Sequence, residues 1–205
     1  MDGDDNRALG KISSSFRRLA LTLEASTTPT LDVASFSDAC DLVSPLFGCL
    51  GIAFKFAEMD YVAKVRDLAK ASGTVSTLDL LVEKDVETNQ VKVAGSHARN
   101  LLRVKRGIDM VKVLFEEILA SEDNSLRGPA SKAYSQVFAP HHGWAIRKAV
   151  SAGLYTLPTK AQLLRKLNED ESSAKTHMQS YVTSSLLVIE YIDSLFLTRQ
   201  LGIDW

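Results

Sequence analysis

The stretch Ser96–Ala120 reads SHARNLLRVKRGIDMVKVLFEEILA and predicts one long helix whose character changes along its length. Ser96 can cap its start, and Arg99 and Arg103 follow one helical turn apart. On a helix, one face carries positions 99, 103, 106, 110, 114 and 118. That face begins with guanidinium groups and ends as hydrocarbon. Such a gradient suits a pocket for an amphiphile with an anionic head and apolar tails.

Positive charge is concentrated just before and within this helix. The segment from Lys92 to Arg106 holds five Lys and Arg residues and no acid: Lys92, Arg99, Arg103, Lys105 and Arg106. The whole chain of 205 residues, by contrast, has a formal net charge of −1. Since the excess charge is local, the sequence indicates a small anion site and argues against a nucleic-acid partner.

A second helix, expected from Gly51 to Ala71, carries a complementary pattern. Asp60 and Lys64 lie one turn apart, and Phe56 and Ile52 precede them on the same face. If the two helices pack antiparallel, the four charged residues meet at one end. Apolar residues would then line a cavity beneath them, and we expect Ile52, Phe56, Val113 and Leu114 among these. The alternative is two ordinary i,i+4 pairs on solvated faces.

The rest of the chain is helical in pattern almost throughout. We expect an all-α fold of about eight helices in two packed layers, without a linker, so that 1–205 forms one domain with 1–6 disordered. The sequence contains no Gly-rich phosphate loop, nucleophile elbow or His-Glu-x-x-His motif. We therefore predict a protein that is not an enzyme and that needs no cofactor.

The N-terminal residues and the cysteines predict the cellular compartment of the protein. The chain begins with an acidic, polar segment, unlike a signal peptide, and its two cysteines suit a reducing compartment. The longest strongly apolar run, Leu46–Phe54, is too short to cross a bilayer. We expect a cytosolic monomer whose membrane contact is peripheral and transient.

A third cluster, Pro140–Trp144, reads PHHGW. His142 at a helix entrance could donate a hydrogen bond to a carbonyl or phosphate oxygen, and Trp144 would suit a membrane interface. Arg147 and Lys148 follow and could attract anionic lipids. The alternatives are an ordinary helix start and a core tryptophan. No cysteine or carboxylate stands at zinc-ligand spacing from these histidines, so no metal is expected.

Together, three motifs resemble the glycolipid transfer protein superfamily, over most of the chain from about Phe36 onward. They are Asp60-x-x-x-Lys64, Arg99-x-x-x-Arg103-Val-Lys-Arg-Gly107 and His142-Gly143-Trp144. The resemblance implies a two-layer helical fold that extracts one sphingolipid at a time from a membrane. It also implies that Asp60 accepts hydrogen bonds from the ceramide amide and that His142 binds the ceramide carbonyl.

The headgroup residues depart from the glycolipid-binding members of that family. Those members carry an asparagine at the position of Lys64 and a sugar-stacking tryptophan at that of Arg103. Cations in these places suit a phosphate, because charge-assisted hydrogen bonds from Arg and Lys are strong. The resemblance thus implies a ceramide 1-phosphate carrier that uses Lys64, Arg99 and Arg103, with Arg106 as a further candidate.

The likeness is greatest to plant members of the superfamily. By analogy, it implies a role in restraining programmed cell death and in defence signalling. Three alternatives stay open at this point. They are a carrier of neutral glycosphingolipids, a lipid-gated regulator that acts through a protein partner, and an enzyme that acts on the lipid phosphate.

Overall fold

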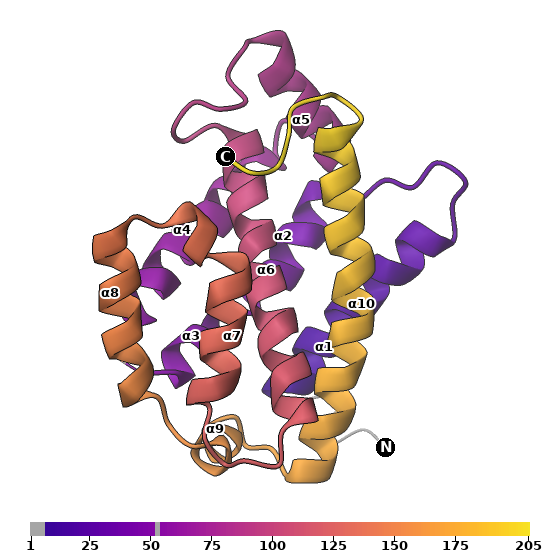
Figure 1. Ribbon diagram of the computed structural model, residues 1–205. Coiled ribbons are helices and arrows are strands. Elements are labelled where there is room, and N and C mark those ends of the chain that lie inside the picture. The colour runs from indigo at the N-terminus through magenta and orange to yellow at the C-terminus, as the bar shows by residue number, and fades with distance from the viewer. Residues whose placement is uncertain (1–6, 52–53) are drawn as a thin grey trace.

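The computed structural model describes residues 7–51 and 54–205, and most of them lie in helices (Figure 1). The α-helices are α1 (Ala8–Glu24), α2 (Val33–Asp41), α3 (Ser44–Cys49), α4 (Lys55–Ala71), α5 (Leu78–Glu87), α6 (His97–Ala120), α7 (Arg127–Val137), α8 (Trp144–Gly153), α9 (Lys160–Lys166) and α10 (Glu171–Leu197). Two short 3-10 helices, Ala139–His141 and Leu154–Thr156, flank α8. The described residues contain isolated β-bridges but no strand, so the predicted all-α class is confirmed.

The helices form two layers, with α6 at the centre of one of them. In Figure 1, α8, α7, α6 and α10 stand side by side in front, and α1, α2, α3 and α4 lie behind them. α6 packs against α7 and α10 in its own layer and against α4 in the other. The chain that follows α10 crosses over the beginning of α6 (Figure 1). The arginine-bearing end of α6 therefore lies where both layers and this final segment meet.

Polar caps begin several of these helices at the positions their sequences predict. The Asp32 carboxylate accepts a hydrogen bond from the Ser35 amide at 2.8 Å, and the Ser96 hydroxyl accepts one from the Arg99 amide at 3.2 Å. Such caps satisfy amide groups that have no partner inside the helix. α4 begins at Lys55, inside the run from Gly51 to Ala71, and Gly51 itself has φ +107°, which is not helical and suits glycine.

The core joins α1, α6 and α10 through three aromatic rings. Tyr181 packs edge-on against Phe16, with centroids 4.8 Å apart, and against Phe115 at 5.5 Å. Its hydroxyl donates to the backbone oxygen of Ile108 at 3.1 Å, so the one polar atom of this buried ring is satisfied. The same contacts hold the middle of α6 in place.

Gly107 brings α4 and α6 unusually close. A Cβ atom at this position would lie 2.5 Å from the ring of Tyr61, which is too short for a real contact. Tyr61 is buried between the two helices and donates its hydroxyl hydrogen to the backbone oxygen of Cys40 at 3.1 Å. The glycine of the sequence motif is therefore explained by helix packing.

α10 is also long and apolar enough, by length and composition alone, to cross a bilayer. Half of its most apolar window is buried inside the protein, and it packs along α1 and α6. This is the behaviour of a core helix. Both cysteines are free thiols; Cys40 is buried and Cys49 is half-buried.

Candidate binding site

A cavity of about 820 Å³ lies between the layers and carries charge at one end. Its walls come mainly from α3, α4, α6, α7 and α8, and the final segment adds Asp204 and Trp205. The predicted polar residues all line it: Asp60, Lys64, Arg99, Arg103, Arg106 and His142. Residues from three separate parts of the sequence are thus brought to one space.

The apolar part of the cavity agrees only partly with the sequence prediction. Leu114 lines it, and Phe56 lies at its rim with 84% of the residue exposed. Val113 is buried but does not line the cavity, because consecutive residues on a helix point about 100° apart. Ile52 lies outside the described residues. Met110, on the predicted face of α6, also lines it. Further apolar and aromatic walls come from residues that the sequence reasoning missed: Leu46, Phe47, Tyr61, Val111, Phe115, Tyr134 and Phe138.

The four cations at the polar end differ in how they are held. Lys64 pairs with the carboxylate of Asp60, and Arg99 donates to the backbone oxygen of Lys92 at 2.9 Å. Within the described residues, Arg103 makes neither a hydrogen bond nor an ion pair with another side chain or backbone group. Its guanidinium is therefore available to an anionic ligand.

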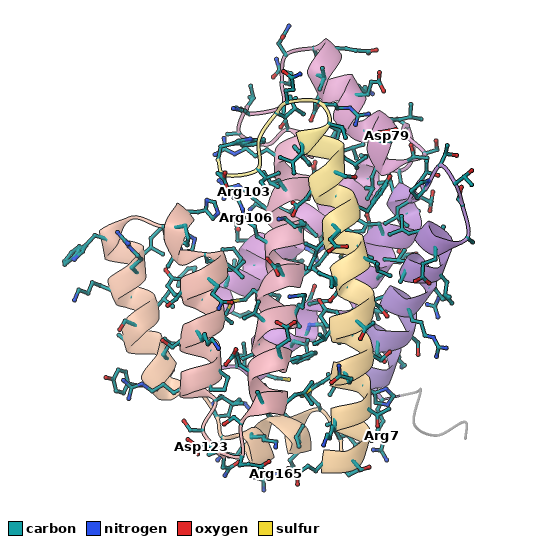
Figure 2. The ribbon with its side chains drawn as sticks, turned by 45° about the vertical axis from the view of Figure 1, so that its right-hand side comes forward. Arg7, Asp79, Arg103, Arg106, Asp123 and Arg165 are labelled. Atoms are coloured by element: carbon teal, nitrogen blue, oxygen red, sulfur yellow. The ribbon has the colours of Figure 1, made fainter. Side chains whose placement is uncertain are left out.

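Arg106 has a different role from Arg103, although both lie at the same end of α6 (Figure 2). It is 5% exposed, and its Nη2 donates to the backbone oxygens of Ile203 at 2.8 Å and Trp205 at 2.6 Å. These bonds tie the final segment to α6. Arg106 thus contributes positive charge to the cavity while its hydrogen bonds serve the fold.

His142 is oriented by two aromatic side chains. Its ring stacks on Phe138, with centroids 5.6 Å apart, and its Nδ1 lies 3.1 Å from the Tyr134 hydroxyl. Burial lowers the pKa of His142 below its usual value; the charge of Arg103 acts in the same direction and Asp60 opposes it. A neutral imidazole that accepts from Tyr134 at Nδ1 carries its proton on Nε2. That N–H can then donate to a ligand oxygen.

The contacts of two charged groups near the site could not be found from sequence spacing. Asp67 accepts hydrogen bonds from Asn100 and pairs with His97, both at 2.8 Å, and so links α4 to α6 beside Lys64 and Arg99. Lys105, by contrast, turns away and pairs with Asp193 of α10 at 2.8 Å. The charge of Lys105 is therefore balanced by a partly buried carboxylate of α10 and not directed to the cavity.

Exposed apolar side chains occur on the helices at the cavity rim. Trp144 is 70% exposed, so the alternative of a core tryptophan is wrong. Phe56, Met59 and Ile146 are also exposed, and Phe56 and Ile146 line the cavity. Arg147 and Lys148 are exposed on α8.

Across residues 7–51 and 54–205, no three His, Cys, Asp or Glu side chains are grouped to hold a metal ion.

A cavity with this polar end and these apolar walls is a feature that the chain shares with a known family. The model of the family Glycolipid transfer protein (GLTP) matches residues 31–169. The chain belongs to this family. As a member of the GLTP family, it shares the two-layer helical fold that the sequence motifs predicted.

Its relatives within the GLTP family include proteins named for lipid transfer and for cell death. Accelerated cell death 11 of Arabidopsis thaliana is 65% identical over 205 residues, which cover 100% of this chain and 99% of that protein. Ceramide-1-phosphate transfer protein of Danio rerio is 30% identical over 140 residues, 62% of this chain and 66% of the fish protein. The crystal structure of the D60N mutant of Arabidopsis ACD11, complexed with C12 ceramide-1-phosphate, matches with a TM-score of 0.95 at 65% identity. That match covers 98% of this chain and 99% of the other.

Proposed function

We propose that this protein is a cytosolic carrier that binds ceramide 1-phosphate and transfers it between membranes without changing it chemically. The observation that carries the proposal is the guanidinium of Arg103, which faces the cavity without a protein partner among the described residues. The relative that is 65% identical has been crystallised with ceramide 1-phosphate, which supports the same ligand here. The name of that relative, Accelerated cell death 11, supports a role in restraining programmed cell death.

The phosphate is held by three cations in this mechanism. Arg103 and Arg99 on α6 and Lys64 on α4 donate hydrogen bonds to the phosphate. Arg106, also on α6, adds positive charge to the same end of the cavity. Hydrogen bonds between cationic donors and phosphate oxygens are short and strong. A neutral sugar would leave Arg103 without a charged partner in a half-buried site, so the site favours phosphate over a glycolipid headgroup.

Asp60 and His142 bind the ceramide part of the lipid. Asp60 accepts hydrogen bonds from the amide N–H and a nearby hydroxyl, which releases Lys64 from its ion pair to meet the phosphate. His142, with its proton on Nε2, donates to the amide oxygen. The two side chains thus fix the amide, whatever headgroup is attached.

The hydrocarbon chains occupy the apolar part of the cavity. Burial of a chain is worth about 0.8 kcal/mol per methylene relative to water. The chains leave a bilayer that is equally apolar. Their contribution to the free energy of extracting the lipid is therefore close to zero. Selectivity then comes from the headgroup, and the protein can release its ligand to a second membrane.

Membrane contact is made by the exposed groups at the rim. Trp144 presents an amphipathic ring suited to the interface, and Phe56 and Ile146 add apolar area beside the cavity. Arg147 and Lys148 add attraction to anionic lipids that salt would screen. A lipid leaving the bilayer here would enter the cavity directly.

Native mass spectrometry of the purified protein against a sphingolipid panel tests the proposal. We expect stoichiometric loading with ceramide 1-phosphate from mixed vesicles and little loading with ceramide, glucosylceramide or sphingomyelin. Loading with glucosylceramide in preference to ceramide 1-phosphate would support the glycolipid alternative instead. Release of inorganic phosphate from the bound lipid would indicate an enzyme.

A further inference from the structure

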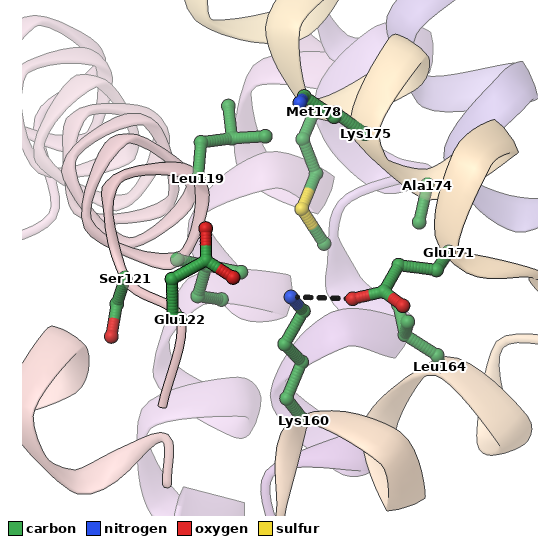
Figure 3. A pocket seen from close by; sticks show the side chains of 10 residues that line it. Leu119, Ser121, Glu122, Lys160, Leu164, Glu171, Ala174, Lys175 and Met178 are labelled. Carbon is green, nitrogen blue, oxygen red and sulfur yellow. Dashed lines mark hydrogen bonds and ion pairs between the residues drawn. The ribbon is translucent and has the colours of Figure 1, made fainter. Parts of the chain in front are cut away.

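A second, smaller cavity lies between α6, α9 and α10 (Figure 3). Its volume is about 180 Å³. The apolar residues that line it are Ile118, Leu119, Leu164, Ala174 and Met178. The proposed function described above makes no use of this cavity.

The register of α6 places the two cavities end to end. Leu114 and Phe115 line the main cavity, and Ile118 and Leu119, four residues further along, line the second. Four residues are about one helical turn, a step of roughly 5.4 Å along the axis. The second cavity therefore continues the direction in which the main one runs away from the cations.

α9 provides the partition between them. Leu163 lines the main cavity and the next residue, Leu164, lines the second. Both leucines are buried. α9 spans seven residues, and polar contacts join its ends to neighbouring segments, such as the hydrogen bond of Lys160 to the Asn124 oxygen at 2.8 Å. A chain that passes from the main cavity into the second must therefore displace these leucines.

The outer rim of the second cavity is charged. Lys160 and Glu171 form an ion pair of 2.9 Å, drawn as the dashed line in Figure 3. Met178 and Leu164 line the cavity on either side of that pair, with Glu122 and Lys175 among the surrounding residues (Figure 3). Charged groups at the rim and hydrocarbon inside favour an apolar occupant that arrives from the main cavity.

We propose that the second cavity receives the terminal carbons of a long acyl chain, and that Leu163 and Leu164 form the partition which this chain displaces. This inference rests on the carrier function proposed above. A chain carbon fills about as much space as a water molecule, ~30 Å³. The main cavity then holds roughly 27 carbons and the second roughly six, from volumes of about 820 and 180 Å³.

These volumes make the chain-length limit specific. A lipid with an 18-carbon base and a 12-carbon acyl chain, the kind bound in the Arabidopsis crystal, is close to the capacity of the main cavity. With an 18-carbon acyl chain the lipid exceeds that capacity by about nine carbons, and the second cavity has space for roughly six of them. The second cavity thus decides how well the protein accepts long-chain ceramide 1-phosphate.

The test is competition between 12:0 and 18:0 ceramide 1-phosphate, loaded from vesicles that contain equal amounts of both and measured by native mass spectrometry. Ala174→Leu fills the second cavity from α10 and should lower the 18:0 to 12:0 ratio at least tenfold. The reason is that each displaced carbon costs about a factor of four. Leu164→Ala removes part of the side chain that separates the two cavities and should raise the 18:0 to 12:0 ratio.

Gln179→Leu is the matched control, because it adds the same side chain to an exposed position of α10. Its ratio should equal that of the parent protein. A folded Ala174→Leu protein with an unchanged ratio would overturn the inference and leave the carrier function intact. If Ala174→Leu does not fold, an unchanged ratio in Leu164→Ala would overturn it. A parent protein that loads neither lipid would instead refute the carrier function.

Discussion

Neutralising Arg103 is the most direct test of the headgroup site. Arg103→Gln keeps a polar side chain of similar reach but removes the positive charge. The fold should survive, since within the described part of the chain no hydrogen bond or ion pair depends on this guanidinium. Any loss of lipid binding then reports on the ligand and not on the scaffold.

The size of the loss follows from how the other cations are held. Lys64 is paired with Asp60 and Arg106 is bound to two backbone oxygens, so neither can fully replace Arg103. A hydrogen bond that involves a charged group is worth about 1.5–3 kcal/mol. Arg103→Gln should therefore weaken ceramide 1-phosphate binding about 10- to 150-fold. Arg103→Glu places an anion opposite the phosphate and should nearly abolish transfer.

The assay is equilibrium binding and vesicle-to-vesicle transfer of ceramide 1-phosphate, with ceramide measured in parallel. Ceramide lacks the phosphate, so its weak binding should change less than twofold in the same variant. Arg66→Gln, on the exposed side of α4, is the charge-matched control. If Arg103→Gln binds ceramide 1-phosphate as tightly as Arg66→Gln does, the phosphate assignment is refuted.

Four further predictions concern the other groups at the site. Asp60→Ala should weaken every ceramide-based lipid to a similar degree, because the carboxylate reads the amide; selective sparing of ceramide 1-phosphate in binding assays would contradict this. Trp144→Ala should reduce partitioning onto vesicles and slow transfer while the affinity for dispersed lipid is retained, and normal docking of a folded variant would place the docking face elsewhere. Gly107→Ala should lower the free energy of unfolding by about 1–3 kcal/mol in urea titrations, because the added methyl overlaps the Tyr61 ring; an unchanged midpoint would mean that the helices separate without cost. Burial lowers the pKa of His142 from its usual 6.5, so below that pH the unfolded chain binds more protons and stability should fall as the pH drops. His142→Gln should make the decrease in unfolding free energy between about pH 7.5 and about pH 5.5 smaller, and an unchanged decrease would show that His142 does not titrate in this range.

The sequence by itself determined the helices and the kind of chemistry they carry. Caps such as Asp32 and Ser96 and the spacing of Arg99 and Arg103 are local properties, and periodicity along one helix predicts which residues share a face. The cationic end of the site was predictable for this reason. So was its amphiphilic gradient, since both follow from a single stretch of α6 together with the matching pair on α4.

The tertiary structure alone decided which of these side chains remain available to a ligand. Arg106 and Arg103 look alike in the sequence, yet only Arg106 is bound to backbone oxygens nearly a hundred residues away, because the final segment folds over the start of α6. The orientation of His142 by Tyr134 likewise depends on packing between separate elements. Contacts of this kind depend on how whole helices are positioned relative to one another. They therefore produce no periodic pattern in the sequence.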